Sequence, residues 1–200
     1  VQAVADLGYT QPTSVQLKAI PLAMGSGNDS TSFIDLMVSS QTGSGKTAAF
    51  LLPVLHTLIQ QQAAAEAEER AAFERAVAEA AARGEPAPKR AKRKDPTNSR
   101  NFKAATPGAL ILCPTRELAQ QVAHDAIDLV KHCRGLRVAN VVGGMPYQLQ
   151  IAKLQNANLV VATPGRLLDL QRSMQIKLDK VQFLVVDEAD RMLDLGFSDD

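Results

Sequence analysis

The sequence contains few cysteines and no long apolar run, and each shortage disfavours a class of protein. Cys113 and Cys133 are its only cysteines. Neither belongs to a CxxC pair or to a His-Cys cluster, so a disulfide scaffold or a structural zinc site is not expected. The apolar runs have the length of strands, and the N-terminus lacks a basic region followed by an apolar one, so neither a membrane span nor a signal peptide is predicted. We therefore expect a cytoplasmic protein without membrane contact.

The sequence also lacks an excess of charge of either sign. Its 22 lysines and arginines oppose 21 aspartates and glutamates, whereas proteins that hold nucleic acid by charge alone are strongly basic. Any contact with nucleic acid must therefore be local. A length of 200 residues is ample for one α/β domain and short for two.

Short β-rich runs alternate with helical patterns along most of the chain. The runs with the composition of buried parallel strands are 33–39, 109–113, 137–142, 159–162 and 183–186. The helical stretches are 46–60, 116–132, 148–156 and 166–172. This alternation predicts an α/β fold, with a parallel sheet, helices on both faces, and ligands at the carboxyl ends of the strands.

The segment 60–103 interrupts the alternation. Its first part is rich in Ala, Glu and Arg, and pairs such as Glu66 and Arg70 have the i,i+4 spacing that supports a solvated helix. Residues 84–103 are rich in Pro, Lys and Arg, with seven basic residues against two acidic ones. We expect an insertion, helical and then disordered and basic. The basic part is either a solvated linker or a tether for RNA.

A glycine-rich loop, residues 40–47, follows the first predicted strand and opens a helix. In this context backbone N–H groups cradle phosphate oxygens. Lys46 can reach the β- and γ-phosphates of a nucleotide, and the Thr47 hydroxyl can complete the coordination of Mg²⁺. Ser40 stands where the strict phosphate-binding pattern has Gly or Ala. The alternative interpretation is an ordinary glycine-rich turn before a helix.

The last predicted strand ends in two carboxylates, Asp187 and Glu188. Alone, this pair indicates the start of a solvated loop. Opposite a phosphate-binding loop, Asp187 would hold Mg²⁺, and Glu188 would orient or deprotonate the water that attacks the γ-phosphate. The two motifs together predict a catalytic set of Lys46, Asp187 and Glu188, with Thr47 and Asp187 on the metal ion.

With Ala189 and Asp190, the acidic pair forms the tetrapeptide after which DEAD-box RNA helicases are named, and the chain resembles that family. Residues 8–16 resemble its Q motif, in which the glutamine that matches Gln16 reads the adenine edge. The resemblance implies ATP and Mg²⁺ as cofactors. The residues that it places on the nucleotide are Tyr9, Gln11, Thr13, Gln16, Thr42, Gly43, Ser44, Gly45, Lys46 and Thr47.

Three further segments resemble motifs that line the RNA channel of the family. Their residues are Pro114, Thr115 and Arg116; Gly143 and Gly144; and Thr163, Pro164, Gly165 and Arg166. Each follows a predicted strand, and hydroxyl groups, glycine backbone and arginines suit contacts to phosphates. None offers an aromatic platform, so we expect binding to RNA that is independent of base sequence. Each segment alone is also compatible with ordinary turn chemistry.

The resemblance implies an N-terminal RecA-like P-loop domain over residues 1–200. It also implies that the chain stops before the family's Ser-Ala-Thr motif, to which Asp190 would couple, and lacks the second RecA-like domain with its arginine fingers. Such a monomeric fragment would bind nucleotide and hydrolyse it very slowly. Two stretches around the loop and the tetrapeptide resemble the bacterial RhlE-type branch. A DNA translocase and a nucleotide-gated RNA clamp remain the alternative functions.

Overall fold

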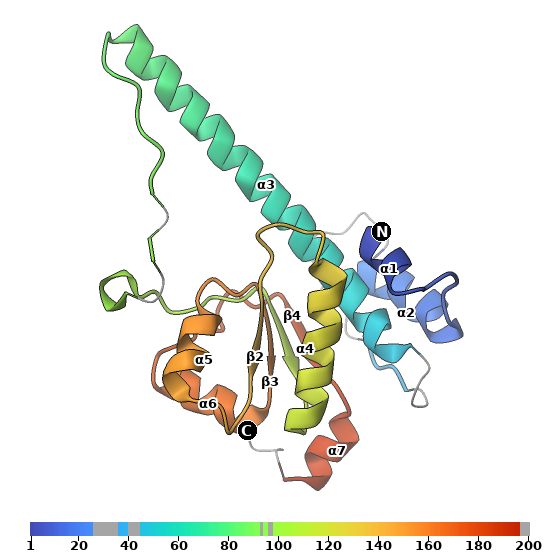
Figure 1. The fold of residues 1–200 in the computed structure, drawn as a ribbon. Helices are drawn as coiled ribbons and strands as arrows, with labels where there is room; N and C mark the ends of the chain where they lie inside the picture. The colour runs from blue at the N-terminus through green and yellow to red at the C-terminus, as the bar shows by residue number, and fades with distance from the viewer. Residues whose placement is uncertain (26–35, 40–44, 93, 96–97, 197–200) are drawn as a thin grey trace.

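The structure, a computed structural model, describes residues 1–25, 36–39, 45–92, 94–95 and 98–196. Its centre is a parallel sheet of four strands in the order β2-β3-β1-β4 (Figure 1). The strands are β1 (Ala109–Leu112), β2 (Val138–Val141), β3 (Leu159–Ala162) and β4 (Phe183–Val186). The predicted α/β class with a parallel sheet is confirmed, and the last two strands have the predicted bounds.

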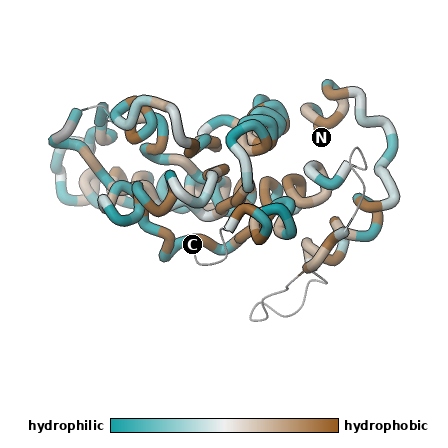
Figure 2. The backbone as a smooth tube through the Cα atoms, turned by 90° about the horizontal axis from the view of Figure 1, so that it is seen from below, coloured by the Kyte–Doolittle hydropathy of each residue, from teal (hydrophilic) through white to brown (hydrophobic). Residues whose placement is uncertain are grey.

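Helices cover both faces of the sheet. On one face, α3 (Lys46–Ala82) and α4 (Arg116–Val130) pack with Ile111 and Val161 into one apolar cluster. On the other, α5 (Tyr147–Leu154) and α6 (Pro164–Arg172) pack with Leu110 and Val160 into a second cluster. Successive residues of a strand point to opposite faces of the sheet. The continuous apolar runs of β1 and β3 therefore contribute side chains to both clusters. Figure 2 shows hydrophobic positions recurring along the helices, with hydrophilic ones between them.

The predicted strand 33–39 is not borne out over its described part. Residues 36–39 form no strand, and Met37 is 98% exposed. They line a shallow pocket against α2 (Ser14–Met24), while residues 33–35 lie outside the described residues. An apolar run signals a need for burial, but a strand also needs a neighbouring backbone to pair with. No described strand pairs with this segment.

The helix expected at 46–60 and the solvated helix expected in the first part of the insertion form one continuous helix, α3, which ends at Ala82. Its 37 residues extend for about 55 Å at 1.5 Å per residue. The first four turns bury Leu51, Val54, Leu55 and Leu58 against the sheet. The remainder projects from the domain as an arm, after which the chain returns to β1 (Figure 1). Throughout this article, the arm is residues 60–82 and the return segment is residues 84–103.

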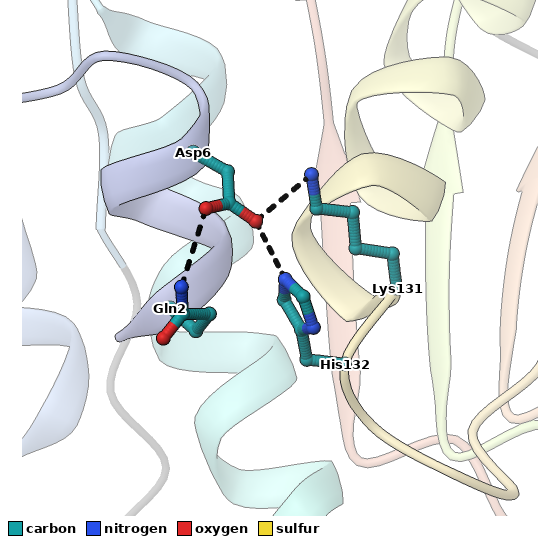
Figure 3. Close-up of polar contacts among 4 residues, drawn as sticks. All are labelled: Gln2, Asp6, Lys131 and His132. Atoms are coloured by element: carbon teal, nitrogen blue, oxygen red, sulfur yellow. Dashed lines mark hydrogen bonds and ion pairs between the residues drawn. The ribbon is translucent and has the colours of Figure 1, made fainter.

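Two N-terminal helices pack against the sheet domain. Helix α2 lies along α3, and α1 (Gln2–Asp6) is joined to the end of α4 by an ionic cluster (Figure 3). In it, Asp6 Oδ2 lies 3.1 Å from Lys131 Nζ and 2.6 Å from His132 Nε2. These partners lower the pKa of Asp6 to about 2, with His132 the larger cause. The sequence spacing gives no sign of the contact between His132 and Asp6, because the two residues lie 126 positions apart.

The remaining described elements are short. They are η1 (Ser99–Asn101) in the return segment and α7 (Ala189–Asp194) after β4. Within the described ranges, no helix combines the length and the apolar character that crossing a membrane requires.

Candidate nucleotide and RNA site

The predicted site residues follow the carboxyl ends of all four strands. The segment 114–116 follows β1, the glycine doublet follows β2, the segment 163–166 follows β3, and Asp187 follows β4. Because the strands are parallel, these ends share one edge of the sheet, called here the carboxyl edge. Ligands of open parallel α/β sheets bind at such an edge.

The start of α3 and the end of β4 meet at this edge. Lys46 Nζ lies 3.3 Å from Asp187 Oδ1, and the Asp187 side chain is only 3% exposed. Asp187 is held there by its backbone N–H, which donates to the Leu112 carbonyl at 2.9 Å. A buried carboxylate is stable when a cation compensates it. The structure thus brings together two predicted catalytic groups that are 141 residues apart in the sequence.

Gln16, in the segment that resembles the Q motif, lies against the end of the glycine-rich loop. Gln16 Nε2 donates to the Gly45 carbonyl at 3.2 Å, and Gln16 Oε1 accepts from the Thr13 N–H at 3.0 Å. The Thr13 hydroxyl in turn accepts from the Gln16 N–H, which completes a capping box at the start of α2. Gln16 therefore links α2 to the loop at the head of α3.

Gly45 occupies a position that suits glycine for two reasons. Its φ of +81° is in the left-handed region, and a Cβ there would lie 2.5 Å from Gln16 Nε2. Thr47 follows in the first turn of α3, where it is half-buried. Thr42, Gly43 and Ser44 lie outside the described residues.

Other predicted nucleotide and coupling residues are more exposed. Tyr9, 52% exposed, and Gln11 lie in the connection between α1 and α2. Asp190 is exposed in the first turn of α7. Glu188 precedes that helix with a φ of +50°, and its carboxylate lies 3.7 Å from Arg191 Nη1. A glutamate in the left-handed region is a strained conformation of the kind found at functional sites.

Cys113 lies beneath the acidic pair at the end of β1. It is fully buried, and burial, together with the nearby charges of Asp187 and Glu188, raises the pKa of its thiol to about 12. A thiol with such a pKa stays protonated and unreactive at neutral pH. Cys113 therefore packs as a small hydrophobic residue, as its place in a strand run predicted.

The first two segments that resemble RNA-channel motifs, residues 114–116 and the glycine doublet, lie beside each other. Arg116 is exposed, and a Cβ on Gly144 would lie 2.7 Å from Arg116 Nη1. Gly143 is likewise exposed, whereas Pro114 is buried. The Thr115 hydroxyl caps α4 by accepting from the Leu118 N–H at 3.3 Å, so a ligand would share this hydroxyl with the helix.

The third segment is tied to α5 by a residue that the sequence did not single out. Gln150, 1% exposed, donates to the Val142 carbonyl at 2.9 Å and accepts from Arg166 Nη1 at 3.0 Å. The Arg166 guanidinium also lies over the Tyr147 ring, 5.7 Å from its centroid. The one feature of the sequence that could have indicated Gln150 is its place as a polar residue on the buried face of an amphipathic helix. Gln150 fixes Arg166 relative to the chain that leads into the glycine doublet.

The rest of the third segment is less uniform in its exposure. Thr163 is half-buried, with its N–H bonded to the Val141 carbonyl, and Pro164 is buried at the start of α6. Gly165 is exposed. The side chains and backbone groups accessible at this edge are therefore those of Arg116, Gly143, Gly144 and Gly165, with partial access to Thr115, Thr163 and Arg166.

Known proteins resemble the chain in both sequence and structure. It is 39% identical over 196 residues to the DEAD-box ATP-dependent RNA helicase 52A of Oryza sativa subsp. japonica. This match covers 97% of the present chain and 27% of the relative. A hypothetical ATP-dependent RNA helicase from Sulfolobus tokodaii superposes with a TM-score of 0.68 at 33% identity, over 99% of this chain and 43% of that one. The RNA helicase Prp28 from Chaetomium thermophilum bound to ADP gives 0.67 at 33% identity, over 98% and 37%.

The chain spans between 24% and 30% of the length of the curated relatives that it matches. Its structural neighbours are RecA-like helicase domains, which confirms the predicted fold class. The sequence pattern of one family, described as DEAD/DEAH box helicase, matches residues 13–200. The chain therefore belongs to the DEAD/DEAH box helicase family.

Proposed function

We propose that this chain is the nucleotide-binding domain of an ATP-dependent RNA helicase, which binds Mg-ATP and the sugar-phosphate backbone of RNA. The observation that carries the proposal is the contact of 3.3 Å between Lys46 Nζ and Asp187 Oδ1. It supports one site that contains both the lysine proposed to bind phosphates and the carboxylate proposed to hold the metal ion. In the nucleotide complex, Lys46 would contact the phosphates and Asp187 would hold the metal ion.

The residues present fit a magnesium nucleotide. Mg²⁺ prefers oxygen ligands, usually one or two from the protein together with phosphate oxygens and water. The Thr47 hydroxyl and the Asp187 carboxylate are such ligands, and bound Mg²⁺ would neutralise charge on the phosphates. Glu188 follows Asp187 directly and would orient the attacking water. Thr42, Gly43, Ser44 and Gly45 would donate backbone N–H groups to the phosphates.

Adenine is the base that Gln16 would select. Its side-chain amide has two N–H donors and two acceptor lone pairs, and the internal bonds to Gly45 and Thr13 use one of each. The remaining donor and acceptor suit the paired hydrogen-bonding edge of adenine. Tyr9, Gln11 and Thr13 would complete this side of the nucleotide site. The neighbouring structure of Prp28 was solved with ADP.

RNA would bind along the carboxyl edge of the sheet. Arg116 and Arg166 supply charge, and the exposed glycines allow a close approach of backbone to phosphate. Pro114 and Pro164, both buried, would hold the turns that present Thr115 and Thr163. This arrangement contacts the backbone of RNA without reading its bases.

Unwinding would require the second RecA-like domain, which we propose as the partner of this one in the same protein. An arginine finger is typically worth about 10³ to 10⁵ in rate, so the 200-residue chain should hydrolyse ATP very slowly. Asp190 would couple the nucleotide state to the Ser-Ala-Thr motif and so to remodelling of short RNA duplexes. We also propose a cytoplasmic monomer of the RhlE-type branch, on the sequence stretches named above.

Calorimetry with Mg-ATP tests the nucleotide site. Lys46→Ala should abolish the heat of binding, because it removes the group that faces the phosphates and leaves Asp187 without its compensating charge. Lys153→Ala is the matched control, since Lys153 is exposed on α5, and it should bind as the unsubstituted chain does. Binding by a folded Lys46→Ala variant equal to that of the control would refute the proposed site.

A second substitution tests the role of Glu188 in the protein joined to its second domain. Glu188→Gln should retain Mg-ATP binding and lose turnover, because the amide cannot accept a proton from water. Normal turnover in this variant would contradict the assignment. Comparing RNA with DNA of the same sequence separates a helicase for RNA from a DNA translocase, since only RNA presents the 2′-hydroxyl. A clamp would retain RNA with ATP without separating duplexes.

A further inference from the structure

The return segment presents positive charge at a place remote from the site described above. Its basic side chains that the structure describes are all exposed: Lys89, Arg90, Lys92, Lys94, Arg100 and Lys103. The segment runs down from the tip of the arm and enters β1 at its amino end (Figure 1). The four residues of β1 then separate it from the carboxyl edge by roughly 13 Å, at 3.3 Å per residue.

Contacts hold both ends of the return segment. Near the tip, the Arg90 guanidinium lies 5.2 Å from the centroid of the Phe73 ring on the arm. Near the sheet, the Lys103 N–H donates to Gln155 Oε1 at 3.4 Å, and Ala105 pairs with Ile176 in a parallel bridge. The described residues of the return segment are therefore anchored to the arm near one end and to the sheet domain near the other.

An exposed aromatic ring lies among these charges. Phe102 is 45% exposed and stands between Arg100 and Lys103 in the sequence. Among the described residues, Tyr9 is the one other aromatic side chain with comparable exposure. Exposing a phenylalanine costs hydrophobic free energy. An aromatic face between cations is the arrangement with which proteins stack the bases of single-stranded nucleic acid.

A polar cleft of about 340 Å³ opens beside Lys103. Its size is at the lower end of that of small-ligand sites. It lies at the amino ends of the strands, because Lys103 and Thr106 precede β1, Gly135 precedes β2 and Asn158 precedes β3. The amides of Asn156 and Asn158, with the Thr106 hydroxyl and the Lys103 ammonium, offer hydrogen-bond donors to phosphate, ribose or base.

We propose that the described basic residues of the return segment, Phe102 and this cleft form a second contact for single-stranded RNA, on the opposite edge of the sheet from the first. The choice of RNA as the ligand rests on the proposed function. Charge alone would suit any polyanion, but an exposed ring between cations and a cleft lined by amides suit nucleotides in particular. An RNA strand that contacts both edges of the sheet would bind more tightly than one that contacts a single edge, because the second contact becomes intramolecular once the first has formed.

The test measures binding of a fluorescent 30-nucleotide oligouridylate to the chain at several salt concentrations. Each phosphate contact contributes about 0.7 to the slope of log affinity against log salt for single strands. The double variant Lys92→Gln, Lys94→Gln should therefore lower that slope by up to about 1.4. Phe102→Ala should reduce affinity about tenfold with little change in slope, because base stacking releases no counterions.

The matched control is Arg70→Gln, Arg75→Gln, which removes the same charge from exposed positions of the arm. These arginines stand among glutamates, so the control should keep the slope of the unsubstituted chain. An equal loss in control and test variants would overturn the proposal, as would an unchanged slope in the test variant. A polyglutamate peptide that binds the chain and loses its binding in the test variant and in Phe102→Ala would also overturn it, in favour of an acidic protein partner.

A third variant separates this proposal from the proposed function. Arg166→Ala alters only the carboxyl edge and should weaken binding of the same oligouridylate. If Arg166→Ala weakens binding while the Lys92, Lys94 and Phe102 variants do not, the second contact is refuted and the first stands. If the unsubstituted chain binds no oligouridylate at all, both are refuted.

Discussion

The two halves of α3 form one continuous helix but are stabilised in different ways. The half over the sheet buries Leu51, Val54 and neighbours in an apolar cluster to which β1 and β3 contribute. On the arm, Phe73 and Val77 are half-buried, and most other side chains are exposed. An exposed helix depends on intrinsic propensity and local pairs, each worth a few tenths of a kcal/mol. Helix length and helix stability therefore have separate origins in this molecule.

The largest difference should appear when one side chain is truncated in each half. Leu51→Ala should cost about 2 to 5 kcal/mol of unfolding free energy, because the side chain is fully buried. Val77→Ala on the arm should cost less than about 1 kcal/mol, since alanine also favours helix. Urea denaturation followed by circular dichroism measures both. Equal losses would mean that the arm contributes to the core as much as the first half does.

A smaller difference should separate two glycines near the ends of α3. Gly45 and Gly84 both have a positive φ, +81° and +70°, but only Gly45 lies against another side chain. Gly84→Ala should cost about 1 to 2 kcal/mol for the left-handed conformation alone. Gly45→Ala should cost more and also weaken Mg-ATP binding, because the methyl group would displace Gln16.

Denaturation and calorimetry on the two glycine variants check this expectation. The cost of the backbone conformation cancels between them, so the difference isolates the close approach to Gln16. If Gly45→Ala bound nucleotide as well as Gly84→Ala, the contact between the glutamine and the loop would have no role in the site.

The smallest effect concerns the ionic cluster that joins α1 to α4. The pKa of Asp6 is lowered to about 2 in the folded chain, so its contribution to stability is present above its ordinary value near 4. It should shrink as pH falls from about 4 and be lost as pH falls through about 2. Asp6→Asn should lower the melting temperature slightly at pH 7, and the difference from the unsubstituted chain should shrink steadily as pH falls from about 4 toward about 2. A difference that persists at low pH would show that the carboxylate charge is not the cause.

Local pattern determined much of this protein in advance. Four strands were predicted to within one residue at each end, helped by the continuous apolar runs of β1 and β3, which are buried on both faces. The motif residues at the strand ends were found because each motif is a contiguous stretch. The same reasoning predicted two separate helices where α3 is one continuous helix, and it predicted a strand at 33–39 whose described part, 36–39, forms none.

Contacts between side chains that are far apart in the sequence follow from the tertiary structure alone. The contacts of Lys46 with Asp187, Gln16 with Gly45, and Arg166 with Gln150 depend on strand order and helix packing. The joining of His132 to Asp6 depends on them as well. A run of residues carries its own propensity for helix or strand, whereas a contact between segments depends on how the whole chain packs. Local sequence pattern therefore accounts for most of the helices and strands and for the motifs, whereas the packing of the sheet with its helices brings the residues of the candidate site together.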